Sequence, residues 1–187
     1  MDFAHIEALQ RAGDWDEAGR VLADAARALR AGGAELIVIC TNTMHRVADT
    51  VEAASGLPLL HIADATADAI GAAGLTRVGL LGTRYTMEQP FLRERLQRRG
   101  LEVIVPDEAQ RETVHRVIYD ELCRGRIEDA SRAQYRAIID SLVERGAQGV
   151  ILGCTEIGLL IAPDDASVPL FDTAALHARA AALAALD

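Results

Sequence analysis

Apolar and polar positions alternate along the chain in two ways, one typical of helices and one typical of buried strands. An amphipathic stretch begins where Asp14 precedes Glu17 by three residues, a spacing typical of a helix start, and it ends at Gly32 and Gly33. Its apolar positions recur at helical spacing: Trp15, Ala18, Leu22, Ala25 and Leu29. The apolar run that follows, residues 35–40, is rich in β-branched residues and predicts a strand buried on both faces.

The same alternation continues to the end of the chain. Further strands are predicted over 57–62, 77–83, 101–105, 148–153 and 168–171. Helices are predicted over about 65–73, from Thr86 with Gln89, through 114–122, from Ser131 with Gln134, and over 174–186. Strands that alternate with helices indicate an α/β fold with parallel sheets.

Two segments of the chain match each other. Residues 33–43, GAELIVICTNT, align with residues 146–156, GAQGVILGCTE, and each precedes a strand that begins Pro-Leu. This internal repeat predicts two similar lobes related by a pseudo-two-fold axis. The alignment pairs Cys40 with Gly153 and Thr41 with Cys154. It also pairs Asn42 with Thr155, and Thr43 with Glu156.

The three cysteines occupy different settings. Cys40 continues an apolar run and is expected to be a small buried residue of that strand, and Cys123, late on a helix, is expected to be structural. Cys154 stands between a glycine and polar residues, which predicts a reactive thiol whose pKa is lowered by a helix N-terminus. Ligands bind at the carboxyl ends of parallel strands, so Thr41 and Cys154 are expected to face one cleft.

Composition narrows the possible functions. A chain of 187 residues suits one large domain or two small lobes, and its net charge of −9 argues against a nucleic-acid partner. The sequence lacks Cys-x-x-Cys and His-x-x-x-His pairs and a glycine-rich phosphate loop, so neither a metal nor a nucleotide is predicted. It shows no secretory signal and no apolar run of membrane-spanning length, which predicts a soluble cytoplasmic protein.

Two groups that face one cleft from opposite sides suit racemisation, in which a proton leaves one face of a carbon and another arrives on the opposite face. A thiol has a pKa close enough to working pH to act as acid or base. The charge that develops on the substrate carboxylate needs donors, for which the candidates are Asn42, Thr43, Thr83, Thr86 and Thr155. For Thr86 a helix cap, and for Thr83 a turn, are equally good explanations.

Four stretches, VICTNTMH, LLHIADAT, VGLLGTRYTMEQ and GVILGCTEIGLL, together resemble the aspartate/glutamate racemase family, within it the broad amino-acid racemase branch. The resemblance implies two pseudo-symmetric Rossmann-like lobes with the active site between them, no cofactor, a homodimer and an acidic amino acid as substrate. It implies catalysis by Cys154 and Thr41. It further implies substrate binding by Asn42, Thr43, Thr83 and Thr155, with Glu156 orienting a group or binding the amino group, and Thr86 stays a candidate substrate-binding donor from its position alone.

The chain departs from the family pattern at two points. Thr41 stands where the family has its first cysteine. Because an alcohol is a much weaker acid than a thiol, catalysis is expected to be faster from one enantiomer. Thr41 is expected to need help from His45 or a water. The family also begins with a strand–helix unit that is expected to be absent here, with residues 1–3 resembling the tail of the next strand. The predicted lobes are 1–74 with about 172–187, and 75–171.

These departures leave two alternatives open. One is a one-cysteine decarboxylase or cis–trans isomerase of the same fold, and the other is a truncated, inactive protein that binds a small acid. Arg46 and Arg84 are the nearest basic residues in sequence, and the sequence assigns neither of them to a second carboxylate.

Overall fold

The structure is a computed structural model that describes residues 1–186. Its strands are β1 (Ile37–Val38), β2 (Leu59–Leu60), β3 (Arg77–Gly82), β4 (Glu102–Ile104), β5 (Val150–Gly153) and β6 (Leu170–Asp172). Its α-helices are α1 (Phe3–Ala12), α2 (Trp15–Ala31), α3 (Ala48–Ser55), α4 (Ile62–Ala72), α5 (Arg84–Glu88), α6 (Pro90–Arg98), α7 (Glu108–Asp120), α8 (Asp129–Glu144), α9 (Ile157–Leu160) and α10 (Thr173–Ala184). Three short 3₁₀ helices are η1 (Thr43–Val47), η2 (Leu122–Arg124) and η3 (Pro163–Asp165).

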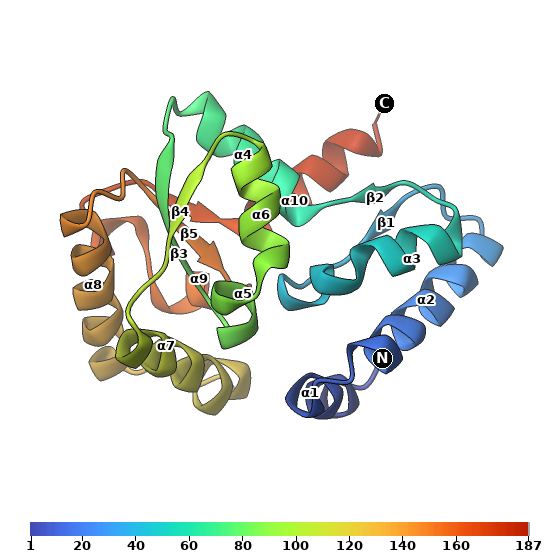
Figure 1. Cartoon of the computed structure of the whole chain (residues 1–187), viewed down its shortest axis with the longest axis horizontal. Coiled ribbons are helices and arrows are strands. Elements are labelled where there is room, and N and C mark those ends of the chain that lie inside the picture. The colour runs from blue at the N-terminus through green and yellow to red at the C-terminus, as the bar shows by residue number, and fades with distance from the viewer. Residues whose placement is uncertain (187) are drawn as a thin grey trace.

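The strands form two separate parallel sheets. The larger has four strands in the order β4-β3-β5-β6, and the smaller consists of β1 and β2 (Figure 1). The sequence prediction of an α/β fold with parallel sheets is therefore confirmed. The predicted lobe boundaries stay a prediction, and residue 187, the last of the expected first lobe, lies outside the described residues.

The internal repeat extends to the backbone hydrogen bonds. In β1, the N–H of Ile37 donates to the carbonyl of Pro58, and in β5 the N–H of Val150 donates to the carbonyl of Pro169, each at 2.9 Å. The strand pairs then continue in matching register, because the residue after each proline pairs with Ile37 or with Val150. The two sheets therefore present the ends of β1 and β5, where Thr41 and Cys154 follow, in equivalent settings.

The two sheets differ at one edge. On its side away from β6, strand β5 pairs with β3, where the N–H of Gly79 donates to the carbonyl of Gly149 at 2.9 Å. The repeat makes Leu36 the equivalent of Gly149. Within residues 1–186, however, β1 pairs with β2 alone, so its other edge carries no strand.

Three apolar cores hold the molecule together. Leu81, Val150 and Leu152 pack on one face of the four-stranded sheet against α7 and α8. The alternate positions of the same strands pack on the other face against α4 and α6, as the two-residue side-chain period of a strand requires. The third core joins α1, α2 and α3 to β1. None of the helices within residues 1–186 is both long and apolar enough to cross a membrane.

Several predicted boundaries are wrong. Residues 1–3 are not a strand tail, because the side chain of Asp2 accepts from the N–H of Ala4 and caps α1. Thr86 does not start a helix: Thr83 caps α5 by accepting from the N–H of Thr86. Helix α8 likewise begins at Asp129, and Ser131 instead donates to a carboxylate oxygen of Glu121 at 2.5 Å.

The strands of the smaller sheet are also shorter than predicted. Only two residues of each predicted strand pair, because β1 has a single neighbour and the chain turns at its end, where the N–H of Thr41 bonds the carbonyl of Ile39 at 2.9 Å. The predicted strand 57–62 stops at Leu60, because His61 accepts from the N–H of Ala63 and starts α4.

Candidate active site

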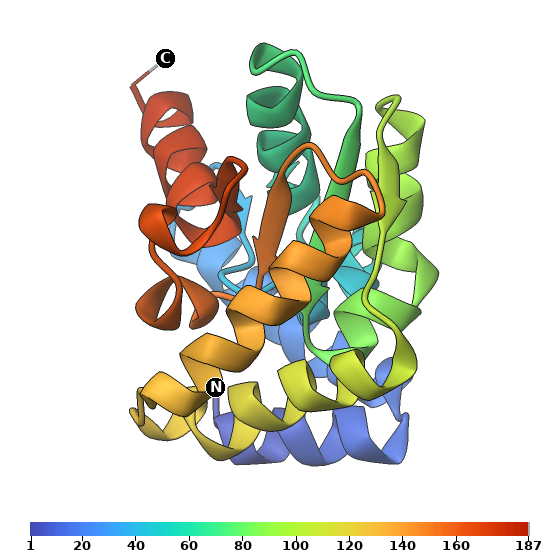
Figure 2. The ribbon, with the colours of Figure 1, turned by 90° about the vertical axis from the view of Figure 1, so that its left-hand side faces the viewer.

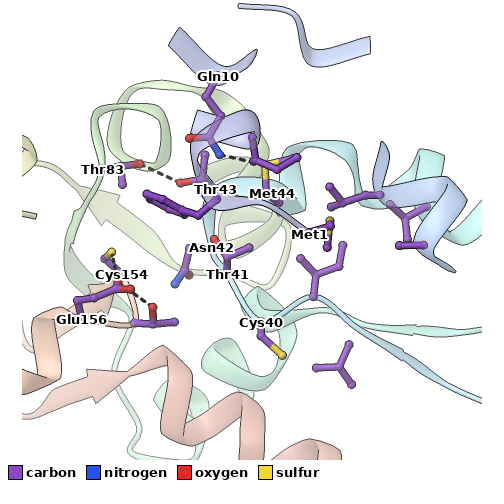
Figure 3. A pocket seen from close by; sticks show the side chains of 18 of the residues that line it. Met1, Gln10, Cys40, Thr41, Asn42, Thr43, Met44, Thr83, Cys154 and Glu156 are labelled. Atoms are coloured by element: carbon purple, nitrogen blue, oxygen red, sulfur yellow. Dashed lines mark hydrogen bonds between the residues drawn. The ribbon is translucent and has the colours of Figure 1, made fainter. Parts of the chain in front are cut away.

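One pocket of about 460 Å³ lies where the loops after β1, β3 and β5 approach helices α1, α2 and α7. It brings together seven of the eight predicted site residues: Thr41, Asn42, Thr43, Thr83, Cys154, Thr155 and Glu156. Figure 3 labels all of them except Thr155. The eighth, Thr86, does not line the pocket but contacts two of the residues that do. The remaining walls are mostly apolar.

Cys154 lies on one side of the pocket with its thiol directed at a carboxylate. Its Sγ donates to Oε2 of Glu156 at 2.9 Å, and the hydroxyl of Thr155 donates to the same oxygen at 2.7 Å (Figure 3). The close approach of two strands positions this loop, because a Cβ on Gly153 would lie 2.6 Å from the carbonyl oxygen of Leu81. One carboxylate oxygen therefore fixes both the thiol and its neighbouring hydroxyl.

The prediction of a lowered thiol pKa is wrong. Burial raises the pKa of Cys154 well above its ordinary value, and the adjacent Glu156 carboxylate raises it further. The expected helix N-terminus contributes little, because α9 is a single turn of four residues that begins beyond Glu156. The resting group is therefore a protonated thiol held against an anion.

Three hydroxyl groups form a triangle on another wall. Oγ1 of Thr43 lies 3.0 Å from that of Thr83 and 3.3 Å from that of Thr86, and the last two are 3.2 Å apart. All three side chains are buried, with at most 5% exposed. Since Thr43 belongs to η1 and the others to the β3–α5 junction, the triangle joins the two sheets at the pocket.

Asn42 is buried with one polar atom unused. Its Nδ2 donates to Oγ1 of Thr173 at 2.9 Å, and that hydroxyl donates in turn to the carbonyl of Leu152 at 2.8 Å. This chain of donors fixes the orientation of the amide. Its Oδ1 finds no partner among residues 1–186, although Asn42 is only 2% exposed. A buried acceptor without a partner at a pocket wall is suited to a ligand that donates.

Thr41 faces the pocket from the end of β1, and His45 supports it through the backbone. Nδ1 of His45 lies 2.8 Å from the carbonyl oxygen of Thr41, and Nε2 accepts from the N–H of Ile62 at 3.1 Å. Both ring nitrogens are thus committed to backbone groups. Burial lowers the pKa of His45 from 6.5 to about 4, so the ring is neutral. The expectation that His45 assists the Thr41 hydroxyl is therefore wrong; the histidine holds the loop.

The other two cysteines also differ from expectation. Cys40 is exposed and lines the pocket, because the chain has already left β1 at Val38. Cys123, in η2, is exposed and lines the pocket as well, and partial burial raises its pKa to about 11. The repeat aligned Thr41, and not Cys40, with Cys154, but it did not predict that the Cys40 side chain would be exposed.

Two pocket residues were missed in the sequence. Gln10 of α1 accepts from the hydroxyl of Tyr119 of α7 at 3.2 Å and donates to the sulfur of Met44 at 3.0 Å. This bridge joins the first helix to α7, which run along the same end of the molecule (Figure 2). A glutamine on the buried side of an amphipathic helix, near Ile6, was the available signal.

The described residues also bear on metal binding. Within residues 1–186, no group of three or more histidine, cysteine, aspartate or glutamate side chains is arranged to hold a metal ion. The residues that line the pocket include three thiols, several hydroxyl groups and two carboxylates.

Comparisons with known proteins agree with this geometry. Residues 1–181 match the family model described as Asp/Glu/Hydantoin racemase. A Yersinia pestis structure, of a protein described as a candidate Asp/Glu racemase, is 58% identical with a TM-score of 0.92, over 100% of this chain and 82% of that one. A Pyrococcus horikoshii aspartate racemase homologue is 38% identical with a TM-score of 0.83, over 96% and 79%.

A sequence relative has a described activity. The broad-specificity amino-acid racemase of Bacillus subtilis is 26% identical over 170 residues, which are 89% of this chain and 71% of that protein. The family match covers far more than half of the chain. The chain therefore belongs to the Asp/Glu/Hydantoin racemase family and is an enzyme of that isomerase class.

Proposed function

We propose that the protein is a cofactor-independent amino-acid racemase that exchanges the α-proton of its substrate between Cys154 and Thr41. The observation that carries the proposal is the matched placement of these residues. Each follows a strand of equivalent register, β5 or β1, and both line one pocket. Membership of the racemase family supports the reaction class.

The Cys154 side supplies the base. Its thiol is protonated at rest and donates to Glu156, so Glu156 is the group that accepts the thiol proton when the substrate binds. A substrate ammonium near that carboxylate favours the thiolate, since an adjacent positive charge lowers a thiol pKa. The thiolate then removes the α-proton, and the electron pair of the broken C–H bond moves into the carboxylate, giving an enediolate.

The Thr41 side supplies the opposing acid. Its hydroxyl gives a proton to the other face of the α-carbon and regains one from water. The proton held by Glu156 neutralises the hydroxide that this leaves, so both residues return to their starting state. In the reverse direction an alkoxide must form first, which is far less favourable than forming a thiolate. The enantiomer whose α-hydrogen faces Cys154 is therefore the faster substrate.

Two groups of side chains orient the substrate. The unpartnered Oδ1 of Asn42 is a buried acceptor and suits the ammonium group. The hydroxyls of Thr43 and Thr83, held in place by Thr86, are donors for the carboxylate, whose charge grows in the transition state. Thr155 keeps the Glu156 carboxylate turned toward the thiol.

The test is α-deuterium uptake from D₂O, measured separately for each enantiomer. Cys154→Ala is expected to lower uptake by about 100-fold or more, in line with the loss of a general base. Cys40→Ala and Cys123→Ala are the matched controls and should retain uptake, because within residues 1–186 Cys154 donates to a carboxylate and neither of these two thiols does. Full activity of folded Cys154→Ala, or loss of activity in folded Cys40→Ala, would exclude the mechanism.

A variant on the opposite side tests the second acid. Thr41→Cys is expected to accelerate the slow direction more than the fast one, whereas Thr41→Val should abolish racemisation and leave exchange of the faster enantiomer's α-proton. Equal changes in both directions would contradict the assignment of Thr41 to one face.

A second candidate reaction follows because only one member of the Cys154–Thr41 pair is a thiol. One protonated thiol is sufficient to give a proton to an enediolate on one face, as a decarboxylase or cis–trans isomerase of this fold requires. Release of CO₂ from a substituted malonate, without racemisation of any amino acid, would favour that reaction. A folded protein that shows neither reaction but is stabilised by a small acid in a thermal-shift assay would indicate a binding protein.

The location of the protein and its oligomeric state remain predictions. A cytoplasmic location is tested by cell fractionation, and a homodimer by light scattering of the purified chain. A third expectation, aspartate or glutamate as substrate, comes from the family resemblance and depends on the charge of the residues that line the pocket.

A further inference from the structure

The pocket contains no basic side chain. Among the lining residues within 1–186 there is no arginine, lysine or histidine, whereas two, Asp2 and Glu156, are acidic. The printed sequence has no lysine anywhere, so arginine is the only side chain that could pair with a carboxylate as a permanent cation. The pocket therefore carries negative rather than positive charge.

The two arginines closest in sequence to the site point elsewhere. Arg46 stacks on the ring of Trp15, 4.5 Å from its centroid, and donates to Gln89 at 2.5 Å. Arg84 forms an ion pair with Glu112 of α7. Neither lines the pocket, and both already have partners.

The polar side chains that α1 and α7 contribute to the pocket already have partners. The hydroxyl of Tyr119 donates to Gln10, and the amide nitrogen of Gln10 donates to the sulfur of Met44. Apart from Gln10, the walls formed by α1, α2 and β1 are aliphatic or aromatic, including Phe3 and Ile37. A carboxylate placed there would lose its hydration without gaining a cation, which is costly.

We infer that the substrate is an amino acid with an uncharged, mainly apolar side chain of about the size of methionine or leucine, rather than aspartate or glutamate. The inference rests on the proposed racemase function. The α-carboxylate and ammonium use the hydroxyl groups, Asn42 and Glu156, and the side chain extends into the apolar part of the pocket. Its volume of about 460 Å³ leaves space for such a chain.

The first experiment is a substrate panel with the unaltered protein. Alpha-deuterium uptake is measured for both enantiomers of methionine, leucine, glutamine, aspartate and glutamate. We expect kcat/KM for methionine or leucine to exceed that for aspartate and glutamate by at least about 10-fold. Higher kcat/KM for aspartate or glutamate would overturn the inference and leave the racemase proposal standing. No uptake from any of the five would instead overturn the racemase proposal.

The second experiment adds the missing cation. Leu29 of α2 lines the apolar part of the pocket, is 54% exposed and has no part in the proposed proton transfers, so Leu29→Arg places a guanidinium there, and Leu29→Gln is the neutral control. We expect the ratio of kcat/KM for glutamate to that for methionine to rise about 10-fold in Leu29→Arg and to stay constant in Leu29→Gln. The same ratio in both variants would overturn the electrostatic basis of the inference. Circular dichroism checks that each variant is folded.

Discussion

His45 is buried as a neutral ring, and this burial predicts how much unfolding free energy the protein loses in acid. The ring lies 3% exposed between the carbonyl of Thr41 and the N–H of Ile62, with two further rings, those of His61 and His177, at centroid distances of 4.4 and 5.7 Å. Protonation of His45 would put a proton where Nε2 accepts from Ile62. The folded protein therefore binds this proton less readily than the unfolded chain.

The magnitude follows from the pKa. Burial lowers the pKa of His45 from 6.5 to about 4, so its contribution to stability is fully present above pH 6.5 and is lost as pH falls toward 4. Linkage converts this shift into about 2 kcal/mol less stability at pH 4.5 than at pH 7. His61, whose pKa burial lowers to about 3, adds a loss of the same sign.

The assay is urea unfolding followed by circular dichroism at pH 7 and at pH 4.5. His45→Gln retains one donor and one acceptor but cannot titrate, so it should lose about 2 kcal/mol less than the unaltered protein between the two pH values. His5→Gln, which changes an exposed histidine of α1, is the control and should behave as the unaltered protein does. A His45→Gln variant with the same pH dependence as the unaltered protein would refute the reasoning.

Three further substitutions test the packing and electrostatics of the site. Gly153→Ala would place a Cβ 2.6 Å from the carbonyl oxygen of Leu81. It should therefore lower the free energy of unfolding by about 1–3 kcal/mol in urea titrations. An unchanged urea midpoint would show that the two strands can move apart to make room. Glu156→Gln should lower the raised pKa of Cys154, because it removes the negative charge beside the thiol. In a protein whose other two cysteines are changed to serine, iodoacetamide should then label Cys154 faster at pH 8. Slower labelling would contradict the assigned cause. Thr173→Val leaves a buried amide and a buried carbonyl unpaired and should cost about 1–3 kcal/mol, whereas Thr173→Ser should cost much less; equal losses would exclude the hydroxyl as the cause.

Much of the fold could be predicted because apolar periodicity and the internal repeat depend on local sequence alone. The alignment that paired Thr41 with Cys154 corresponds to matching hydrogen bonds at Pro58 and Pro169. The helix start at Asp14 is confirmed, because its side chain accepts from the N–H three residues later.

The sequence was less informative where partners distant in the chain decide the outcome. Cys40 extended an apolar run, yet a two-stranded sheet does not continue that far and leaves it exposed. The raised pKa of Cys154 depends on burial against a core that includes α7 and α8, which no local pattern specifies. For the same reason the bridge between Gln10 and Tyr119, which are 109 positions apart, could not be anticipated.

The unpaired edge of β1 has a consequence for the behaviour of the protein at high concentration. Its peptide groups have no strand partner within residues 1–186, and the exposed side chains of Phe3 and Leu29 lie at the adjoining pocket. At the equivalent edge of β5, strand β3 pairs in parallel. The unpaired edge of β1 is therefore a place where a second chain could add a strand at high concentration, and the two-residue length of β1 limits how many hydrogen bonds such pairing would form.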